Sequence, residues 1–134
     1  MKKVYLDNAA TTPMHPEVIQ EMTRVIQEDY GNPSSTHGFG RQAKSILELS
    51  RKAIAKSINA LSQEIIFTSG GTESNNWVLR NAVTTLKIER IISSKIEHHA
   101  VLHTLEALQS EFKIAVDFVA ILSNGEIDVT HLVT

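Results

Sequence analysis

The chain has 134 residues, of which 42% are apolar and 21% are charged, and its formal net charge is -2 at pH 7. This length and apolar content fit one domain with an ordinary core, so we expect a soluble globule or part of one. Neither charge sign forms a run, which argues against nucleic acid or a membrane surface as a partner. Because the chain lacks cysteine, it has no disulfide, thiolate metal site or cysteine nucleophile.

No stretch resembles a targeting or membrane-spanning segment. Asp7 and Asn8 interrupt the N-terminal apolar residues far short of a signal-peptide core. The longest apolar run, residues 114–122, contains Asp117 and is too short to cross a bilayer. We therefore expect a cytoplasmic protein.

The first sixty residues predict an arm followed by helices. Residues 4–6 form a short strand or extended arm, and residues 7–13 are mostly small and hydrogen-bonding. Apolar residues recur at helical spacing from Pro16, and again from about Arg41. Residues 32–38, between these helices, are rich in turn formers and predict an ordered loop.

The second half predicts alternating strands and helices. The expected order is a strand at 65–67, a helix to about residue 83, a strand at 90–93, a helix at 99–110 and a strand at 113–120. Asn124 and Gly125 then predict a turn, and Asp128 a helix N-cap. Because a domain rarely ends in the first turns of a helix, we expect a continuation beyond Thr134.

This order predicts an α/β protein with a mostly parallel sheet and crossover helices. An N-terminal helical segment precedes the sheet. We assign residues 1–60 to the N-terminal arm and helical segment, and residues 61–134 to the first part of the α/β domain.

A glycine turn, residues 69–72, joins the predicted strand at 65–67 to a helix. Gly70 and Gly71 let the backbone take positive φ and approach a ligand, and Thr72 adds a hydroxyl. The unpaired N–H groups at the start of the helix and its dipole suit a phosphate. A turn capped by Ser69 or Thr72 that binds nothing fits the same residues, and this stretch alone does not decide between the two.

Three histidines follow the predicted strand at 90–93. In parallel sheets ligands bind beyond the carboxyl ends of strands, where both the glycine turn and His98 would fall. His98 could stack on an aromatic ring or relay a proton, or simply face solvent at a helix start. His99 and His103 are four residues apart, but a metal site needs at least one more ligand, so we predict none.

Two further patterns are weaker. Residues 38–43 match the dinucleotide fingerprint G-x-G-x-x-G/A, but a polar loop precedes them instead of the required strand. His37 follows serines, yet no serine lies on a strand-to-helix elbow, so a turn-stabilising role is the better interpretation. Asn8 could likewise be a simple turn-forming residue with no role in binding.

Four stretches, in this order, resemble the N-terminal third of cysteine desulfurases. They are YLDNAATTP at residues 5–13, GNPSSTHGFG at 31–40, FTSGGTESNN at 67–76 and EHHAVL at 97–102. Cysteine desulfurases are class V aminotransferases among the fold-type-I enzymes that use pyridoxal 5′-phosphate. The ending His-Gly-Phe-Gly of the second stretch favours desulfurases over other class V members.

The resemblance implies part of the large domain of a fold-type-I enzyme, with pyridoxal 5′-phosphate as cofactor. Gly71 and Thr72 match the positions that hold the cofactor phosphate. His98 matches the histidine that stacks on the pyridine ring and is proposed to move protons, so it is the expected catalytic residue of this chain. The matches near the substrate side of the pocket are Asn8, Ala9, Thr11 and His37.

The family's cofactor-binding lysine, the aspartate that pairs with the pyridinium nitrogen, the substrate-binding arginine and the persulfide-forming cysteine all match positions beyond residue 134. We therefore expect the complete protein to convert L-cysteine, or a related amino acid such as selenocysteine, to L-alanine and enzyme-bound persulfide. A homodimer, a sulfur-acceptor protein and a role in iron–sulfur cluster assembly are also implied. The chain alone is expected to be inactive. A non-catalytic assembly or dimerisation module and one half of a split enzyme are the alternatives.

Overall fold

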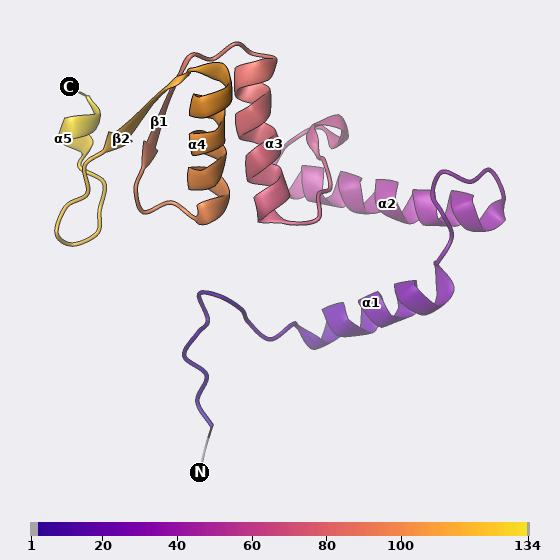
Figure 1. Cartoon of the computed structure of the whole chain (residues 1–134). Coiled ribbons are helices and arrows are strands. Elements are labelled where there is room, and N and C mark those ends of the chain that lie inside the picture. The colour runs from indigo at the N-terminus through magenta and orange to yellow at the C-terminus, as the bar shows by residue number, and fades with distance from the viewer. Residues whose placement is uncertain (1–2, 134) are drawn as a thin grey trace. The chain divides into compact units, whose positions relative to one another are not determined.

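A computed structural model describes residues 3–133, and the predicted continuation at Thr134 lies outside them. The chain divides into two compact units, Met1–Ile66 (unit 1) and Phe67–Thr134 (unit 2). Figure 1 labels the α-helices and strands of both units. The domain boundary predicted between residues 60 and 61 stays a prediction.

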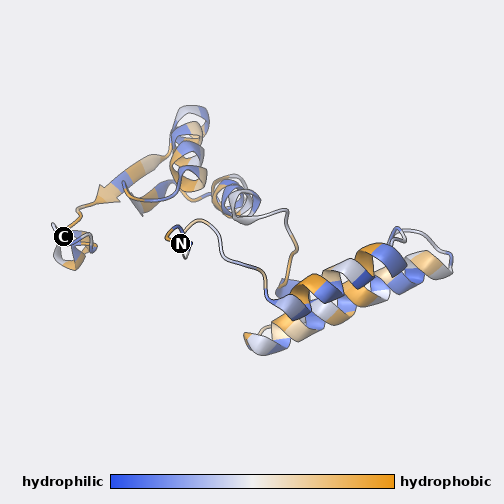
Figure 2. Ribbon diagram, turned by 90° about the horizontal axis from the view of Figure 1, so that it is seen from below, coloured by the Kyte–Doolittle hydropathy of each residue, from blue (hydrophilic) through white to orange (hydrophobic). Residues whose placement is uncertain are grey.

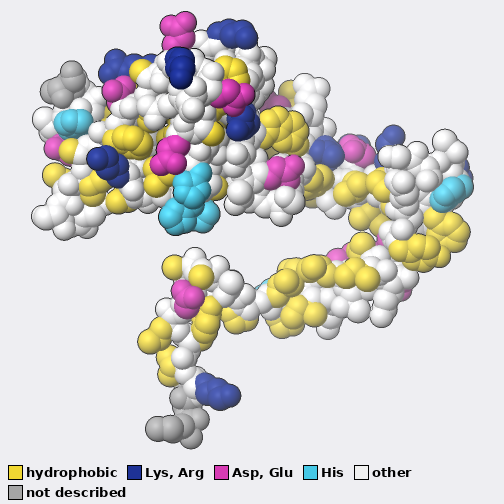
Figure 3. Space-filling view, viewed as in Figure 1, with side chains coloured by type: hydrophobic (Ala, Val, Ile, Leu, Met, Phe, Trp, Pro, Cys, Tyr) yellow, Lys and Arg dark blue, Asp and Glu magenta, His cyan; other side chains and the backbone are white. Residues whose placement is uncertain are grey.

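Unit 1 begins with an arm and a helix that bury almost nothing. Helix α1 spans Pro16–Glu28 and starts at the predicted proline, without a side-chain cap. Its apolar residues lie on one stripe of the helix. Apolar positions are orange on the ribbon of Figure 2, and the apolar side chains are yellow in the space-filling view of Figure 3. None of its residues is buried, and most of its large apolar side chains are exposed.

Helix α2 spans Gly38–Ser57, beginning three residues before the predicted Arg41. The reason is a cap that the periodicity does not reveal: Nδ1 of His37 accepts a hydrogen bond from the Gly40 N–H at 3.4 Å. The predicted turn-stabilising role of His37 is therefore present. A 3₁₀ turn, η1, follows at Ser62–Glu64.

Polar and steric contacts hold the loop between α1 and α2. The Asp29 carboxylate, whose side chain is 1% exposed, accepts from Arg24 at 2.8 Å and also from Gln42. A Cβ at Gly40 would lie 2.4 Å from the Ser35 carbonyl oxygen, so this position accepts only glycine without a shift of the loop. The predicted ordered loop is thus fixed by close backbone packing.

Unit 2 contains a strand–helix–strand crossover. Strand β1 (Arg90–Ser94) pairs in parallel with β2 (Ala115–Val119), with Ile91 opposite Val116, and helix α4 (His99–Phe112) connects them. Helix α3 (Gly71–Thr84) packs beside α4 (Figure 1). The predicted α/β class with a parallel sheet is confirmed.

The core of unit 2 lies between these helices and the sheet. Leu108, which is fully buried, clusters with Val83 and Ile114, and Ile91 and Val116 of the two strands pack against them. Few hydrophobic side chains are fully buried among residues 3–133, and many large ones are exposed. The expectation of an ordinary core was therefore wrong in extent, because apolar content alone does not tell whether the matching faces lie within the chain.

Two local predictions were wrong. Residues 65–67 are not a strand, because the sheet of the described residues contains only β1 and β2 and offers this segment no partner. Gly70 and Gly71 do not use positive φ: Gly70 is extended at 162°, and Gly71 is the first residue of α3. The turn into α3 is therefore made without a left-handed residue.

The C-terminal segment matches its signals. Gly125 has a φ of 89° in the predicted turn, and the Asp128 carboxylate caps helix α5 (Val129–Leu132) by accepting from Thr130 and His131 N–H groups. None of the helices in residues 3–133 combines the length and apolarity that a membrane span requires.

Candidate functional site

The glycine turn presents free hydrogen-bond donors at the start of α3. Gly70 is the N-cap and makes no side-chain cap hydrogen bond, so neither Ser69 nor Thr72 caps the helix. The first N–H groups of α3 have no acceptor within the helix. Among residues 3–133 no hydrogen bond uses the Gly71 N–H, the Thr72 N–H or the Thr72 hydroxyl. These donors, at the positive end of the helix dipole, are available to an anion.

A carboxylate from the same helix fixes the turn. Glu73 accepts from the Ser69 N–H at 2.6 Å and from the Ser69 hydroxyl at 2.7 Å. Both bonds lower the pKa of Glu73; the bond from the Ser69 N–H has the larger effect and the bond from its hydroxyl the smaller one. Because Ser69 is already engaged, an anion at this turn would bind the donors of Gly71 and Thr72.

The space in front of the turn is open. A Cβ built on Gly70 or Gly71 would meet nothing within 4 Å, in contrast to the crowded Gly40. The glycines are therefore not required by packing within unit 2. They leave room for another group to approach the backbone closely.

His98 lies at the start of the neighbouring helix. It is the N-cap of α4, and its Nδ1 accepts from the Ala100 N–H at 3.1 Å. Because Nδ1 is the acceptor, the proton of the neutral ring is on Nε2. The exposed His98 ring is thus held by its own helix while its Nε2–H stays available to a ligand.

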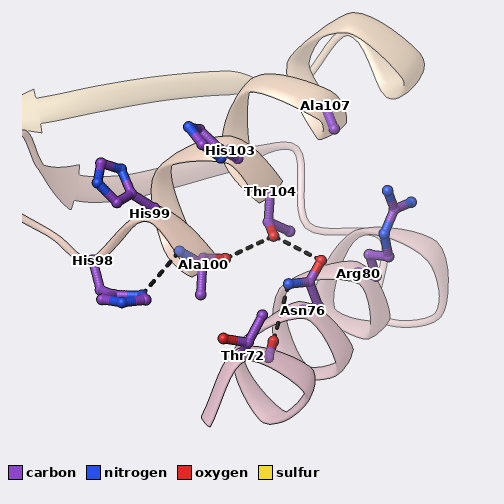
Figure 4. Close-up of a pocket in the computed structure, with 9 residues that line it drawn as sticks. All are labelled: Thr72, Asn76, Arg80, His98, His99, Ala100, His103, Thr104 and Ala107. Carbon is purple, nitrogen blue, oxygen red and sulfur yellow. Dashed lines mark hydrogen bonds between the residues drawn. The ribbon is translucent and has the colours of Figure 1, made fainter.

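A cavity of about 420 Å³ opens between α3 and α4 and contains both Thr72 and His98. Figure 4 shows the residues that line it: Thr72, Asn76, Arg80, His98, His99, Ala100, His103, Thr104 and Ala107. The structure thus brings together two of the predicted cofactor-binding residues, and Gly71 adjoins them in the chain. Most of its lining surface comes from apolar atoms, but Arg80 adds a positive charge and the imidazole, hydroxyl and amide groups add hydrogen-bonding atoms, which suits an anionic ligand with an apolar ring.

His99 and His103 stack on one face of α4, with ring centroids 5.3 Å apart. Within residues 3–133, no three histidine, cysteine or carboxylate side chains are grouped so that they could hold a metal ion. The pair therefore adds ring surface and basic nitrogens to the wall of the cavity.

The predicted substrate-side residues belong to unit 1. Asn8 and Ala9 lie in a turn in which the Asp7 carbonyl accepts from the N–H groups of Ala10 and Thr11. The Thr11 hydroxyl bonds the Tyr5 hydroxyl. His37 caps α2 as described above. Thr72 and His98 belong to unit 2, so the cavity is built from unit 2 alone.

Sequence reasoning missed Asn76 and Thr104, which line the same cavity. Two signals were present. Asn76 is one helical turn after Thr72, and Thr104 interrupts the apolar face of its helix next to Leu105 and Leu108. A polar side chain on a buried helix face needs a hydrogen-bond partner, but the sequence does not show which residue provides it.

The sequence profile of the family described as aminotransferase class-V matches residues 4–134. The chain belongs to the class V aminotransferase family. Individual relatives agree. The chain is 52% identical over 115 residues to the cysteine desulfurase IscS of Dictyoglomus turgidum, and 41% identical over 139 residues to the selenocysteine lyase of Homo sapiens. These matches cover 82% and 90% of this chain, but 29% and 31% of the relatives.

Solved structures show the same likeness. A NifS-like protein aligns with 98% of this chain at a TM-score of 0.89 and 39% identity, and DndA from Streptomyces lividans with 97% at 0.77 and 37%. The chain spans 36% and 37% of these proteins. The resemblance to cysteine desulfurases and the partial fold-type-I architecture are confirmed, and these relatives are enzymes that depend on pyridoxal 5′-phosphate.

Proposed function

We propose that this chain supplies the phosphate clamp and the ring-stacking histidine of a pyridoxal 5′-phosphate-dependent cysteine desulfurase, of which it forms the N-terminal part. The observation that carries this proposal is the cavity between α3 and α4, where Thr72 and His98 line one space. The free donors of Gly71 and Thr72 would hold the phosphate, and His98 would stack on the pyridine ring and act as the catalytic proton carrier.

The residues present fit this cofactor. The open space at Gly70 and Gly71 accommodates the phosphate oxygens, and the start of α3 favours their charge. When bound, pyridoxal phosphate acts as an electron sink for carbanions formed on an amino acid substrate. His98 would hold a transferable proton on Nε2, since its Nδ1 is occupied by the Ala100 N–H.

The substrate follows from the relatives and is part of the proposal. Curated relatives include cysteine desulfurases and selenocysteine lyases, and one structural relative is described as SspA in complex with cysteine. We therefore propose L-cysteine, or a related amino acid, as the substrate of the complete protein. The substrate-side residues would be Asn8, Ala9, Thr11 and His37. Sulfur transfer to an acceptor protein for iron–sulfur cluster assembly, a homodimer and a cytoplasmic location belong to the same proposal.

The chain by itself should bind the cofactor without turning over cysteine. After incubation with pyridoxal phosphate and reduction with borohydride, we expect no single lysine to be labelled stoichiometrically, and no sulfide to be released from cysteine. Stoichiometric labelling of one lysine together with sulfide release would contradict the expected inactivity.

The phosphate clamp can be tested without aldehyde chemistry. Pyridoxine 5′-phosphate lacks the aldehyde, so its binding does not depend on a lysine, and pyridoxine without phosphate is the ligand control. We expect the phosphate ester to bind more tightly, with amide shifts at Gly71 and Thr72 in nuclear magnetic resonance spectra. Thr72→Val should weaken binding roughly tenfold, as for loss of a hydrogen bond to a charged group.

The matched control for this substitution is Thr84→Val. Thr84 lies at the other end of α3, and its hydroxyl donates only to the Arg80 carbonyl of its own helix, at 2.8 Å. Its replacement should leave the affinity for pyridoxine 5′-phosphate unchanged. Equal affinities for pyridoxine and its phosphate, or equal losses in the two variants, would refute the clamp.

A non-catalytic assembly module is the second candidate, and the exposed apolar stripe of α1 favours it. Val18, Ile19 and Ile26 are 47%, 50% and 71% exposed. A module of this kind would self-associate through α1 and would not discriminate between pyridoxine and its phosphate. Light scattering combined with the binding titration separates the two candidates, since a monomer that binds the phosphate ester supports only the first.

A further inference from the structure

A chain of hydrogen bonds runs across the cavity from Thr72 to His98 (Figure 4). The Asn76 side-chain amide donates to the Thr72 carbonyl at 3.0 Å, and its Oδ1 accepts from the Thr104 hydroxyl at 2.8 Å. The Thr104 hydroxyl also lies 2.8 Å from the Ala100 carbonyl. The Ala100 N–H in turn donates to Nδ1 of His98. Thr104 shares its one proton between two acceptors, and the last step passes through the backbone of Ala100 from its carbonyl to its N–H. The start of α3 is linked in this way to the N-cap of α4.

The middle of this chain is the buried part. Thr104 is 4% exposed, and Asn76 is half-buried. Away from water a hydrogen bond is electrostatically stronger, and a lost partner leaves an unsatisfied polar group. The Thr104 hydroxyl has one proton and two acceptors within reach, so it serves either Asn76 or Ala100 at a given moment and keeps both close to it.

Within residues 3–133, one further side-chain link joins α3 and α4, and it is weaker and farther from the turn. Arg80 and Glu111 approach to 3.2 Å, but their side chains are 44% and 54% exposed, and exposed pairs contribute little. Arg80 is two helical turns beyond Thr72. Of these two links, the part-buried Asn76–Thr104 bond thus lies nearer to the two site residues.

We propose that Asn76 and Thr104 are positioning residues, which set the separation of the phosphate clamp at Thr72 from the ring of His98 and hold that ring in its Nε2–H form. This inference rests on the proposed function for its ligand, but its geometry belongs to unit 2 alone. Thr104 holds the backbone of Ala100 through its carbonyl, and the N–H of the same residue keeps Nδ1 of His98 as an acceptor.

The test compares the tautomer of His98 in variants of the 134-residue chain, by nitrogen-15 spectra at a pH where the ring is neutral. Thr104→Val keeps the side-chain volume and removes the hydroxyl. The Ala100 N–H stays available to Nδ1 of His98 in this variant, so the ratio of the Nδ1–H to the Nε2–H form should rise because the backbone of Ala100 is held less firmly. We expect this ratio, and the dissociation constant for pyridoxine 5′-phosphate, each to rise by up to about tenfold, which is the most that loss of one neutral hydrogen bond allows. Asn76→Ala should shift the ratio in the same direction, and serves if the valine variant does not fold.

Thr104→Ser restores the hydroxyl and should restore both the tautomer ratio and the affinity. Thr84→Val, which removes a hydroxyl that bonds only within α3, should change neither. An unchanged His98 spectrum in folded Thr104→Val and Asn76→Ala would overturn the positioning role. If the spectra change as expected while no variant binds pyridoxine 5′-phosphate, the positioning role stands and the proposed cofactor function fails.

Discussion

Residues 3–66 of unit 1 and residues 67–133 of unit 2 are each stabilised internally, by different interactions. In unit 2, hydrophobic burial dominates: Leu105 and Leu108 are 1% and 0% exposed, and Ile91 and Val116 of the parallel strand pair pack against the cluster that contains Leu108. In unit 1, a charged side chain, that of Asp29, is buried and paired with Arg24. Close contacts between glycines and the backbone fix the loop beside it. The cavity with Thr72 and His98 lies in the unit that has its own hydrophobic core.

This difference indicates which part can position a ligand alone. A site needs side chains locked by packing around it, and in unit 2 the helices α3 and α4 meet that condition. In unit 1 the apolar faces of α1 and the arm are uncovered, so those segments have little burial to stabilise them. We therefore expect cofactor binding to follow the integrity of unit 2.

The largest expected effect comes from removing the centre of the core in unit 2. Leu108→Ala should lower the free energy of unfolding of unit 2 by about 2–5 kcal/mol, because it deletes a fully buried side chain. Leu49→Ala in α2, where the side chain is 63% exposed, should cost no more than about 0.5 kcal/mol. Residue-resolved hydrogen exchange reports each unit separately. If Leu49→Ala lowered the protection of α2 as much as Leu108→Ala lowers that of α4, the contrast between the units would be contradicted.

A second test concerns the steric packing of unit 1. Gly40→Ala should destabilise the loop and the start of α2 by about 1–3 kcal/mol, since its Cβ would collide with the carbonyl oxygens of Ser35 and Asn32. Helix propensity alone would predict the opposite sign. Gly38→Ala is the matched control, because a Cβ there meets nothing within 4 Å. Hydrogen exchange in α2 measures both, and equal effects would argue against close packing at Gly40.

The smallest expected effect is a pH dependence at the glycine turn. The hydrogen bonds from Ser69 lower the pKa of Glu73 from its ordinary value of 4.5. At pH values above 4.5 the ionised carboxylate therefore stabilises the start of α3 in full. This contribution is lost as the pH falls through the lowered pKa. Ser69→Ala should move the titration midpoint of Glu73 partly back towards 4.5, since the backbone bond remains. A side-chain carboxyl titration by nuclear magnetic resonance checks this, and an unmoved midpoint would exclude the Ser69 hydroxyl as a cause.

The helices were the most predictable part of the fold. Pro16 and the Asp128 cap are local signals that act through neighbouring backbone groups, and both mark helix starts in the structure. The strand predicted at 65–67 failed for a non-local reason, since a strand exists only when another strand pairs with it. The positive φ expected at Gly70 failed because an extended residue can also lead into a helix.

Of the residues in the candidate site, only those at the helix starts, Thr72 and His98, could be predicted from the sequence. The sequence by itself determined that a helix begins at the glycine turn, within one residue of Thr72, and that His98 precedes another, because caps and turns depend on adjacent residues. It also determined the family, through four ordered stretches. Only the tertiary structure decided that these two helices pack side by side and that Asn76 meets Thr104 between them. Those two residues are 28 positions apart, and the sequence pattern contains no signal that couples a polar residue on one helix to its partner on another.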